Sequence, residues 1–175
     1  MKLTGGPTQD EIMAISMQKL GLLKDDIFAD IGCGTGKISI EASKMCKKVI
    51  AIDKREEAIR YAGREIEESS AENICLIKGE AGKTLLEIDY LDCAFLGGSV
   101  NIEAVLDRLN EIVQRRIVVN AVMLETVSKT VNKMKELDIF EEAVYVQVTK
   151  SCDIAAGIMF KPINPVYIIS GSVNK

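Results

Sequence analysis

Histidine and tryptophan are absent from this chain of 175 residues, and only three residues are proline. Without histidine there is no Ser-His-Asp triad, no imidazole base and no imidazole ligand for zinc. Any chemistry must therefore use carboxylates, lysines, the leaving group of a cofactor or a substrate that is already nucleophilic. The five cysteines are scattered and form no C-x-x-C pair, so we expect neither a disulfide framework nor a bound metal.

Long apolar runs are lacking as well. No run is long enough to cross a bilayer, and the first residues lack the apolar core of a signal peptide, so we expect a cytoplasmic protein with no membrane partner. The net charge is −4 and the isoelectric point is about 5.1. Nucleic-acid binding leaves a cationic footprint, which this acidic chain does not show. The length predicts a single domain over residues 1–175.

What the chain does contain is a glycine-rich turn, Asp30-Ile31-Gly32-Cys33-Gly34-Thr35-Gly36. It lies between a strand-like run and a helix-like run, which is the arrangement of a nucleotide-binding βα turn. Asp53 ends the next strand-like run, where a carboxylate can accept hydrogen bonds from two ribose hydroxyls. The competing interpretation is a glycine-rich turn with two solvated aspartates.

Two known nucleotide-binding motifs match this turn only in part, and these mismatches narrow the choice of ligand. Lys37 stands where a dinucleotide fingerprint has its last glycine, and Ile31 and Ile38 do not fit the phosphate-binding P-loop. The remaining D-x-G-x-G-x-G pattern resembles the cofactor motif of S-adenosylmethionine (SAM) methyltransferases. We therefore predict a SAM site.

Apolar spacing predicts alternating helices and strands. Helices are expected over 8–20, 37–46, 56–68, 102–113 and 125–137, the first with Thr8 as N-cap and Glu11 completing a capping box. Strands are expected over 26–31, 49–53, 74–78, 92–96 and 116–122, followed by 142–149 and 166–169 with no helix between these last two. The predicted fold is α/β: a doubly wound, Rossmann-like class I SAM-dependent methyltransferase, with a seven-stranded, mostly parallel sheet and a C-terminal antiparallel hairpin.

Ligands of such sheets bind at the carboxyl ends of the strands. Glu80 lies at one of these ends and either contacts the adenine amino group or belongs to a solvated loop. Gly97-Gly98-Ser99 stands where enzymes that methylate amino nitrogens carry a clamp, and its glycines leave room for a bulky, flat substrate. Asn164-Pro165-Val166-Tyr167 resembles that clamp, but its position indicates only the start of the last strand.

Two further segments leave alternatives open. Glu125 begins a helix, where a favourable interaction with the helix dipole is a better explanation than catalysis. Residues 154–162 form an apolar linker containing Lys161, which is either an oligomer contact or a lip over the substrate cleft.

Several segments together resemble the decarboxylating cobalt-precorrin carbon-15 methyltransferases of cobalamin biosynthesis. They are Gly5-Gly6-Pro7-Thr8, 30–36, 97–99, 120–126 and 164–166, so the resemblance spans nearly the whole chain. It implies methyl transfer from SAM, giving S-adenosylhomocysteine, to carbon-15 of a cobalt-precorrin. It also implies decarboxylation of the acetate on carbon-12, and a homotetramer.

The resemblance implies cofactor contacts at Thr8, Gly32, Cys33, Gly34, Thr35, Gly36, Asp53 and Ala81, to which strand-end position adds Glu80. We expect substrate contacts at Gly97, Gly98, Ser99, Asn120 and Lys161. Only their position at strand ends makes Glu125, Asn120 and Ser99 catalytic candidates. Methylation of another small molecule and a non-catalytic SAM-binding scaffold remain the alternative functions.

Overall fold

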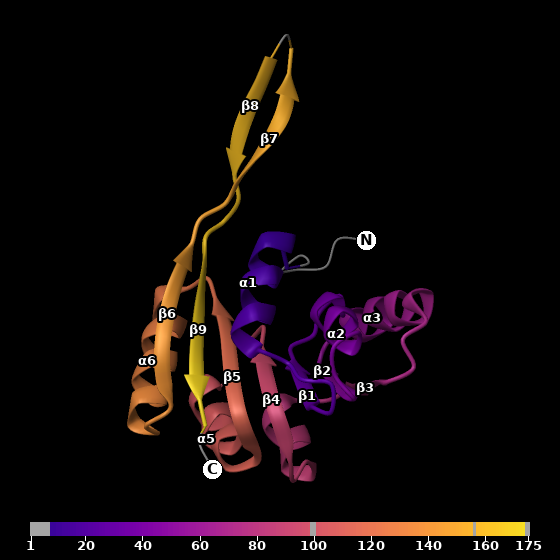
Figure 1. Cartoon of the computed structure of the whole chain (residues 1–175), viewed down its shortest axis with the longest axis vertical. Helices are drawn as coiled ribbons and strands as arrows, with labels where there is room; N and C mark the ends of the chain where they lie inside the picture. The colour runs from indigo at the N-terminus through magenta and orange to yellow at the C-terminus, as the bar shows by residue number, and fades with distance from the viewer. Residues whose placement is uncertain (1–7, 99–100, 156, 174–175) are drawn as a thin grey trace.

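The computed structural model describes residues 8–98, 101–155 and 157–173. Within this part of the chain, seven strands form one sheet (Figure 1). In order across the sheet they are β3 (Ile74–Lys78), β2 (Lys48–Asp53), β1 (Ile27–Ile31), β4 (Leu91–Leu96), β5 (Val113–Ala121), β9 (Val166–Ser172) and β6 (Phe140–Val146). Strands β1 to β5 pair in parallel, and β9 runs antiparallel to both β5 and β6. This confirms the predicted mostly parallel sheet with an antiparallel pair at its end.

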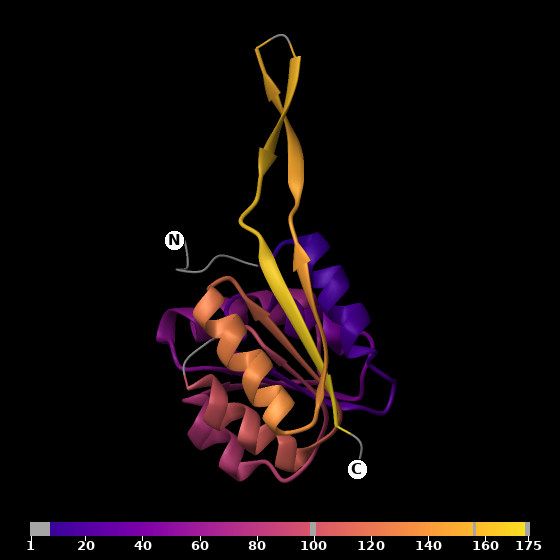
Figure 2. The same ribbon diagram turned by 90° about the vertical axis from the view of Figure 1, so that its left-hand side faces the viewer.

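Helices cover both faces of the sheet (Figure 2). They are α1 (Asp10–Leu20), α2 (Lys37–Ser43), α3 (Glu56–Ser69), α4 (Ala81–Thr84), α5 (Ile102–Ile112) and α6 (Leu124–Glu136), with a 3-10 turn η1 (Leu85–Glu87) after α4. One apolar core joins α1 and α2 to the sheet around Phe28 and Phe95. The other joins α5 and α6 to the opposite face around Leu106 and Met134. None of the described helices is long and apolar enough to span a bilayer.

The start of α1 differs from its predicted start. The helix begins at Asp10 and its N-cap residue is Gln9, with no side-chain cap, so the predicted capping box is wrong. The carbonyl of Thr8 instead accepts a hydrogen bond from Lys37 Nζ (2.8 Å), and the Glu11 carboxylate pairs with Lys150 (2.9 Å). Both residues of the predicted capping box thus contact partners distant in sequence, and the start of α1 has no side-chain cap.

The end of α2 also comes earlier than predicted, at Ser43. The side-chain amide of Asn73 donates to the carbonyls of Ser43 (2.9 Å) and Cys46 (3.0 Å). Carbonyls at a helix end need such partners, and these allow the chain to leave the helix there. The short helix α4 and the turn η1 were not predicted, whereas the other helices and the strands of the seven-stranded sheet lie close to their expected positions.

The predicted linker over 154–162 is wrong, because most of it forms a strand. Strands β7 (Thr149–Ile154) and β8 (Gly157–Pro162) make a separate antiparallel pair that projects from the domain as an arm (Figures 1 and 2). Lys150 lies opposite Lys161 in this pair. The arm exposes Ile158 (69%) and Phe160 (66%) to solvent.

Candidate functional site

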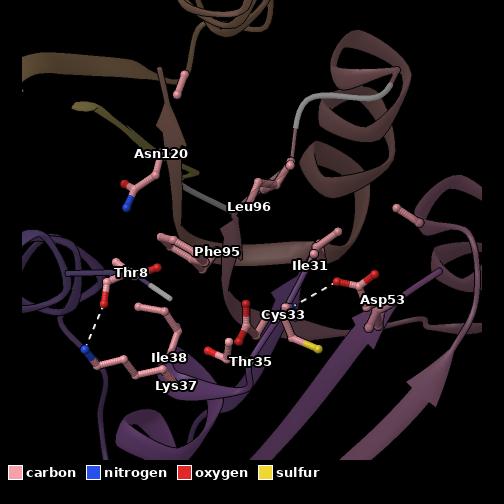
Figure 3. A pocket seen from close by; sticks show the side chains of 18 of the residues that line it. Thr8, Ile31, Cys33, Thr35, Lys37, Ile38, Asp53, Phe95, Leu96 and Asn120 are labelled. Carbon is pink, nitrogen blue, oxygen red and sulfur yellow. Dashed lines mark hydrogen bonds between the residues drawn. The ribbon is translucent and has the colours of Figure 1, made fainter. Parts of the chain in front are cut away.

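A cavity of about 730 Å³ opens at the carboxyl ends of β1, β2, β4 and β5 (Figure 3). The order of the strands reverses between β1 and β4. Loops that follow these two strands therefore leave toward opposite faces of the sheet and open a crevice between them. Figure 3 shows Asp53 on one side of this cavity and Asn120 on the other.

The glycine turn forms the floor of the cavity and packs against the end of β4. Gly32 has φ +79°, and a Cβ added there would lie 3.2 Å from the backbone nitrogen of Gly98. A side chain is thus disfavoured both by the left-handed backbone and by the neighbouring strand. Its absence brings the turn's backbone into the cavity, where a ligand can approach it closely.

Asp30 lines the cavity and is fully buried. Its Oδ2 accepts a hydrogen bond from Ser39 Oγ (2.5 Å), whereas its Oδ1 is buried without a partner among the described residues. Burial raises the pKa of this carboxyl to about 7, although the Ser39 hydrogen bond acts in the opposite direction. An unpaired buried carboxylate oxygen is costly, so this atom is suited to a cationic ligand group.

Asp53 also lines the cavity, with its carboxylate almost fully buried. Arg55 contacts both of its oxygens, with Nε 3.0 Å from Oδ1 and Nη2 2.8 Å from Oδ2. Burial alone would raise the pKa of Asp53, but hydrogen bonds from Arg55 and from the backbone of Gly34 outweigh it and lower the pKa. Asp53 is therefore ionised at neutral pH.

The loop after β3 forms another part of the wall, through Glu80 and Ala81. Glu80 is the N-cap residue of α4, and its Oε1 lies 3.4 Å from the backbone nitrogen of Gly82. The carboxylate is thus held by its own loop and does not point freely into solvent. Cys33 lines the cavity beside the turn, and burial raises the pKa of its thiol far above the usual range, so it is no thiolate nucleophile.

The loop after β4 lines the opposite side with Gly97 and Gly98, and the end of β5 does so with Asn120. A Cβ added at Gly98 would meet nothing within 4 Å, whereas one added at Gly97 would lie 3.1 Å from the carbonyl oxygen of Gly32, so open space is found at Gly98 and not at Gly97. The Asn120 side-chain nitrogen lies 3.0 Å from Ser16 Oγ on α1. Next along the chain, Val122 and Met123 line the cavity and stay more than half exposed, so this side presents an apolar surface.

The structure does not bring every predicted site residue to the cavity. Gly36 lies at the start of α2 against Ala62, and Glu125 is exposed in the first turn of α6. Neither residue lines the cavity, and Lys161 lies on the arm. Ser99 and the Gly5-Gly6-Pro7 segment lie outside the described residues. Among the described residues, no group of acidic and cysteine side chains is placed to hold a metal ion, and metal-free function stays a prediction.

Sequence reasoning missed several residues of the wall, among them two polar ones, Arg55 and Asn164. Arg55 follows Asp53 by two positions, a spacing that could have suggested a contact between the side chains. Asn164 lies just before β9 and also lines the cavity. Both residues reach the site because β2 ends and the antiparallel strand β9 begins at the same edge of the sheet.

Comparisons with known proteins agree with this geometry. The family model of the precorrin methyltransferase domain matches residues 3–172. A protein of Methanosarcina acetivorans, named "probable cobalt-precorrin-6B C(15)-methyltransferase (decarboxylating)", is 47% identical over 98% of this chain and 96% of its own length.

Two solved structures extend the comparison. The precorrin 8W decarboxylase of Methanobacterium thermoautotrophicum superposes with a TM-score of 0.93 at 27% identity, over 98% of this chain and 95% of that one. A SAM-dependent O-methyltransferase of Thermotoga maritima shares the fold alone, with a TM-score of 0.78 at 16% identity over 100% of this chain and 68% of that one. The match of the family model over nearly the whole chain and the close relative together decide the matter: this chain belongs to the precorrin methyltransferase family.

Proposed function

We propose that this protein methylates carbon-15 of a cobalt-precorrin with SAM and decarboxylates the acetate side chain on carbon-12, in anaerobic cobalamin biosynthesis in the cytoplasm. The main support is the near-full-length similarity to a relative named for this reaction. The cavity gives independent support, because its acidic residues match a SAM molecule at one end and its apolar surface offers room for the face of a flat macrocycle at the other.

The cofactor end is assigned by charge and by space. The unpaired Oδ1 of buried Asp30 would accept a hydrogen bond from the ammonium group of the methionyl part. The backbone of the turn from Gly32 to Thr35 would lie beside that part of the cofactor. Asp53 would bind the ribose, and Glu80 and Ala81 would border the adenine. When bound, SAM would supply a methyl group attached to a sulfonium sulfur. After methyl transfer this sulfur becomes the neutral thioether of S-adenosylhomocysteine.

Among the residues that the structure describes, no acidic or basic side chain is assigned to the substrate end. Val122, Met123 and the open space at Gly98 would receive the flat macrocycle, with Asn120 beside them. A partly reduced macrocycle is enamine-like, so its carbon is nucleophilic without a protein base, and the residues of the wall mainly align it. The apolar surface also removes water from the acetate carboxylate that is lost. Glu125 is better placed to interact with the dipole of α6 than to act here.

Mass spectrometry of the product tests the reaction directly. The protein is incubated with SAM and the cobalt-precorrin, with S-adenosylhomocysteine in place of SAM as the control. We expect a product that has exchanged one hydrogen for methyl and has lost one carbon dioxide, with one S-adenosylhomocysteine formed per turnover. An unchanged precorrin, with SAM still bound in calorimetry, would leave another small-molecule substrate or a binding scaffold as the function.

We further propose that the arm makes the protein a homotetramer, as the family resemblance implies. An isolated two-stranded sheet is marginally stable in water, and this one exposes Ile158 and Phe160. A few bonds to the body tie it down, such as the ion pair between Lys150 and Glu11. Pairing of arms from several copies would cover these apolar side chains and satisfy the free strand edges.

The mass in solution tests the role of the arm. The wild type is expected to have four times the 19.2 kDa mass of the chain in light scattering, and the double variant Ile158→Lys/Phe160→Lys a smaller mass. Leu86→Lys is the matched control, because Leu86 is equally exposed (67%) but lies on the body. An unchanged mass with a raised KM for the precorrin would instead make the arm a lip over the cleft.

A further inference from the structure

The carboxylate of Asp53 has every hydrogen-bonding position filled. Its Oδ1 accepts from the backbone nitrogen and Nε of Arg55, both at 3.0 Å. Its Oδ2 accepts from the backbone nitrogen of Gly34 (3.0 Å) and from Nη2 of Arg55 (2.8 Å). A carboxylate offers about four such positions. Two ribose hydroxyls therefore find no vacant lone pair on it.

Two of these four donors are backbone nitrogens, and the other two belong to the guanidinium of Arg55. The backbone nitrogen of Gly34 belongs to a turn fixed by hydrogen bonds from Gly32 to Ile52 (2.8 Å) and from Gly36 to Cys33 (2.8 Å). The backbone nitrogen of Arg55 sits at the start of α3, where its carbonyl accepts the bond from Ile59 (3.1 Å). The guanidinium, by contrast, is on a flexible side chain that is 37% exposed, and water can solvate it when it swings away.

We propose that Arg55 occupies the two carboxylate oxygens of Asp53 in the ligand-free protein and is displaced when the ribose binds. The proposal rests on the assignment of SAM to this cavity. Arg55 and the ribose compete for the same two oxygens, so part of the binding free energy of the cofactor is used to break the ion pair. Arg55 also lies over the turn, with Nη2 3.7 Å from a Cβ built at Gly34, so its departure widens the entrance.

A double-mutant cycle tests the competition, with S-adenosylhomocysteine as the probe in calorimetry at pH 8. Arg55→Met should tighten binding roughly threefold to tenfold, because it removes the competitor of the ribose. In the Asp53→Asn background the same substitution should have no effect. Lys54→Met is the matched control, since Lys54 is the neighbouring cation of the same wall, and it should not tighten binding.

The displacement itself is visible by NMR in wild-type protein. The Nε–H resonance of Arg55, assigned by its loss in Arg55→Met, should shift when adenosine is added and should not shift with 2′,3′-dideoxyadenosine. Weaker binding by Arg55→Met in both backgrounds would show that Arg55 contacts the ligand, and would overturn the proposal. So would an unmoved resonance in protein saturated with S-adenosylhomocysteine. Absence of any binding to wild type would instead overturn the proposed function, which the first titration reveals.

Discussion

Replacing Asp30 with asparagine is expected to stabilise the ligand-free protein at pH 8 and to weaken the binding of SAM. The carboxyl is fully buried and its pKa is raised to about 7, mainly by burial. In the unfolded chain the carboxyl loses its proton near pH 4, whereas in the folded protein it keeps the proton until about pH 7. The free energy of unfolding therefore falls as the pH rises from 4 to 7. The wild type therefore loses stability over this window, by an upper limit of about 4 kcal/mol, and the neutral asparagine does not.

Urea unfolding at pH 4.5 and pH 8 measures this difference. Asp26→Asn is the informative control, because Asp26 is equally buried but pairs with Arg115 and accepts a hydrogen bond from the backbone of Leu23 (2.8 Å). Loss of that paired charge should lower the free energy of unfolding at pH 8, whereas Asp30→Asn should raise it. If Asp30→Asn lowered stability at pH 8, the buried carboxyl would have a partner that the structure does not show.

Ligand binding tests the contact between Asp30 and the ammonium group separately from stability. Asp30→Asn should reduce the binding free energy of S-adenosylhomocysteine by about 1.5–3 kcal/mol, the usual value of a hydrogen bond to a charged group. It should leave 5′-methylthioadenosine unaffected, because that compound lacks the amino acid part. An equal loss for both ligands would place Asp30 at the adenosine instead.

Gly32→Ala is expected to lower the free energy of unfolding by about 2–4 kcal/mol, since it combines a left-handed backbone with a crowded Cβ. Gly32 has φ +79°, and the new methyl would lie 3.2 Å from the nitrogen of Gly98 and 3.4 Å from the carbonyl carbon of Gly97. Both neighbours are backbone atoms at the end of β4, so neither can rotate away. The turn must shift, and cofactor binding should fall with it.

Gly98→Ala is the matched control for this substitution. It lines the same cavity, but a Cβ there meets nothing within 4 Å and the backbone is not left-handed. Its stability in urea should stay within about 0.5 kcal/mol of the wild type. Equal stability of the two variants would mean that the turn adapts without cost and that the contact between the two loops is loose.

Much of the fold was predictable because its signals are local. The glycine turn, the β-branched strand β5 and the two final strands without an intervening helix each have a short-range pattern in the sequence. The predicted N-cap at Thr8 is wrong: α1 begins at Asp10 with Gln9 as its N-cap residue, and Thr8 instead contacts a lysine on α2 through its carbonyl. The arm was read as a linker because nothing local indicates whether a projecting pair of strands is stable alone.

The site was predictable only in part, for a similar reason. Strand-end position placed Asp53, Glu80, Gly98 and Asn120 at one cavity. The unpaired oxygen of Asp30 depends on how α2 docks, since only Ser39 reaches that carboxyl. The ion pair between Arg55 and Asp53 depends on a side-chain rotamer, which no periodicity encodes.

The place of β9 has a consequence for how the protein is made. The last strand of the chain inserts between β5 and β6 and pairs with both. On the ribosome, the parallel strands can assemble as they emerge, but β6 has no sheet to join until β9 follows it. The cavity wall likewise runs from Thr8 to Val166. The full wall of the cavity therefore forms only once β9 has joined the sheet, because Asn164 and Val166 belong to that wall.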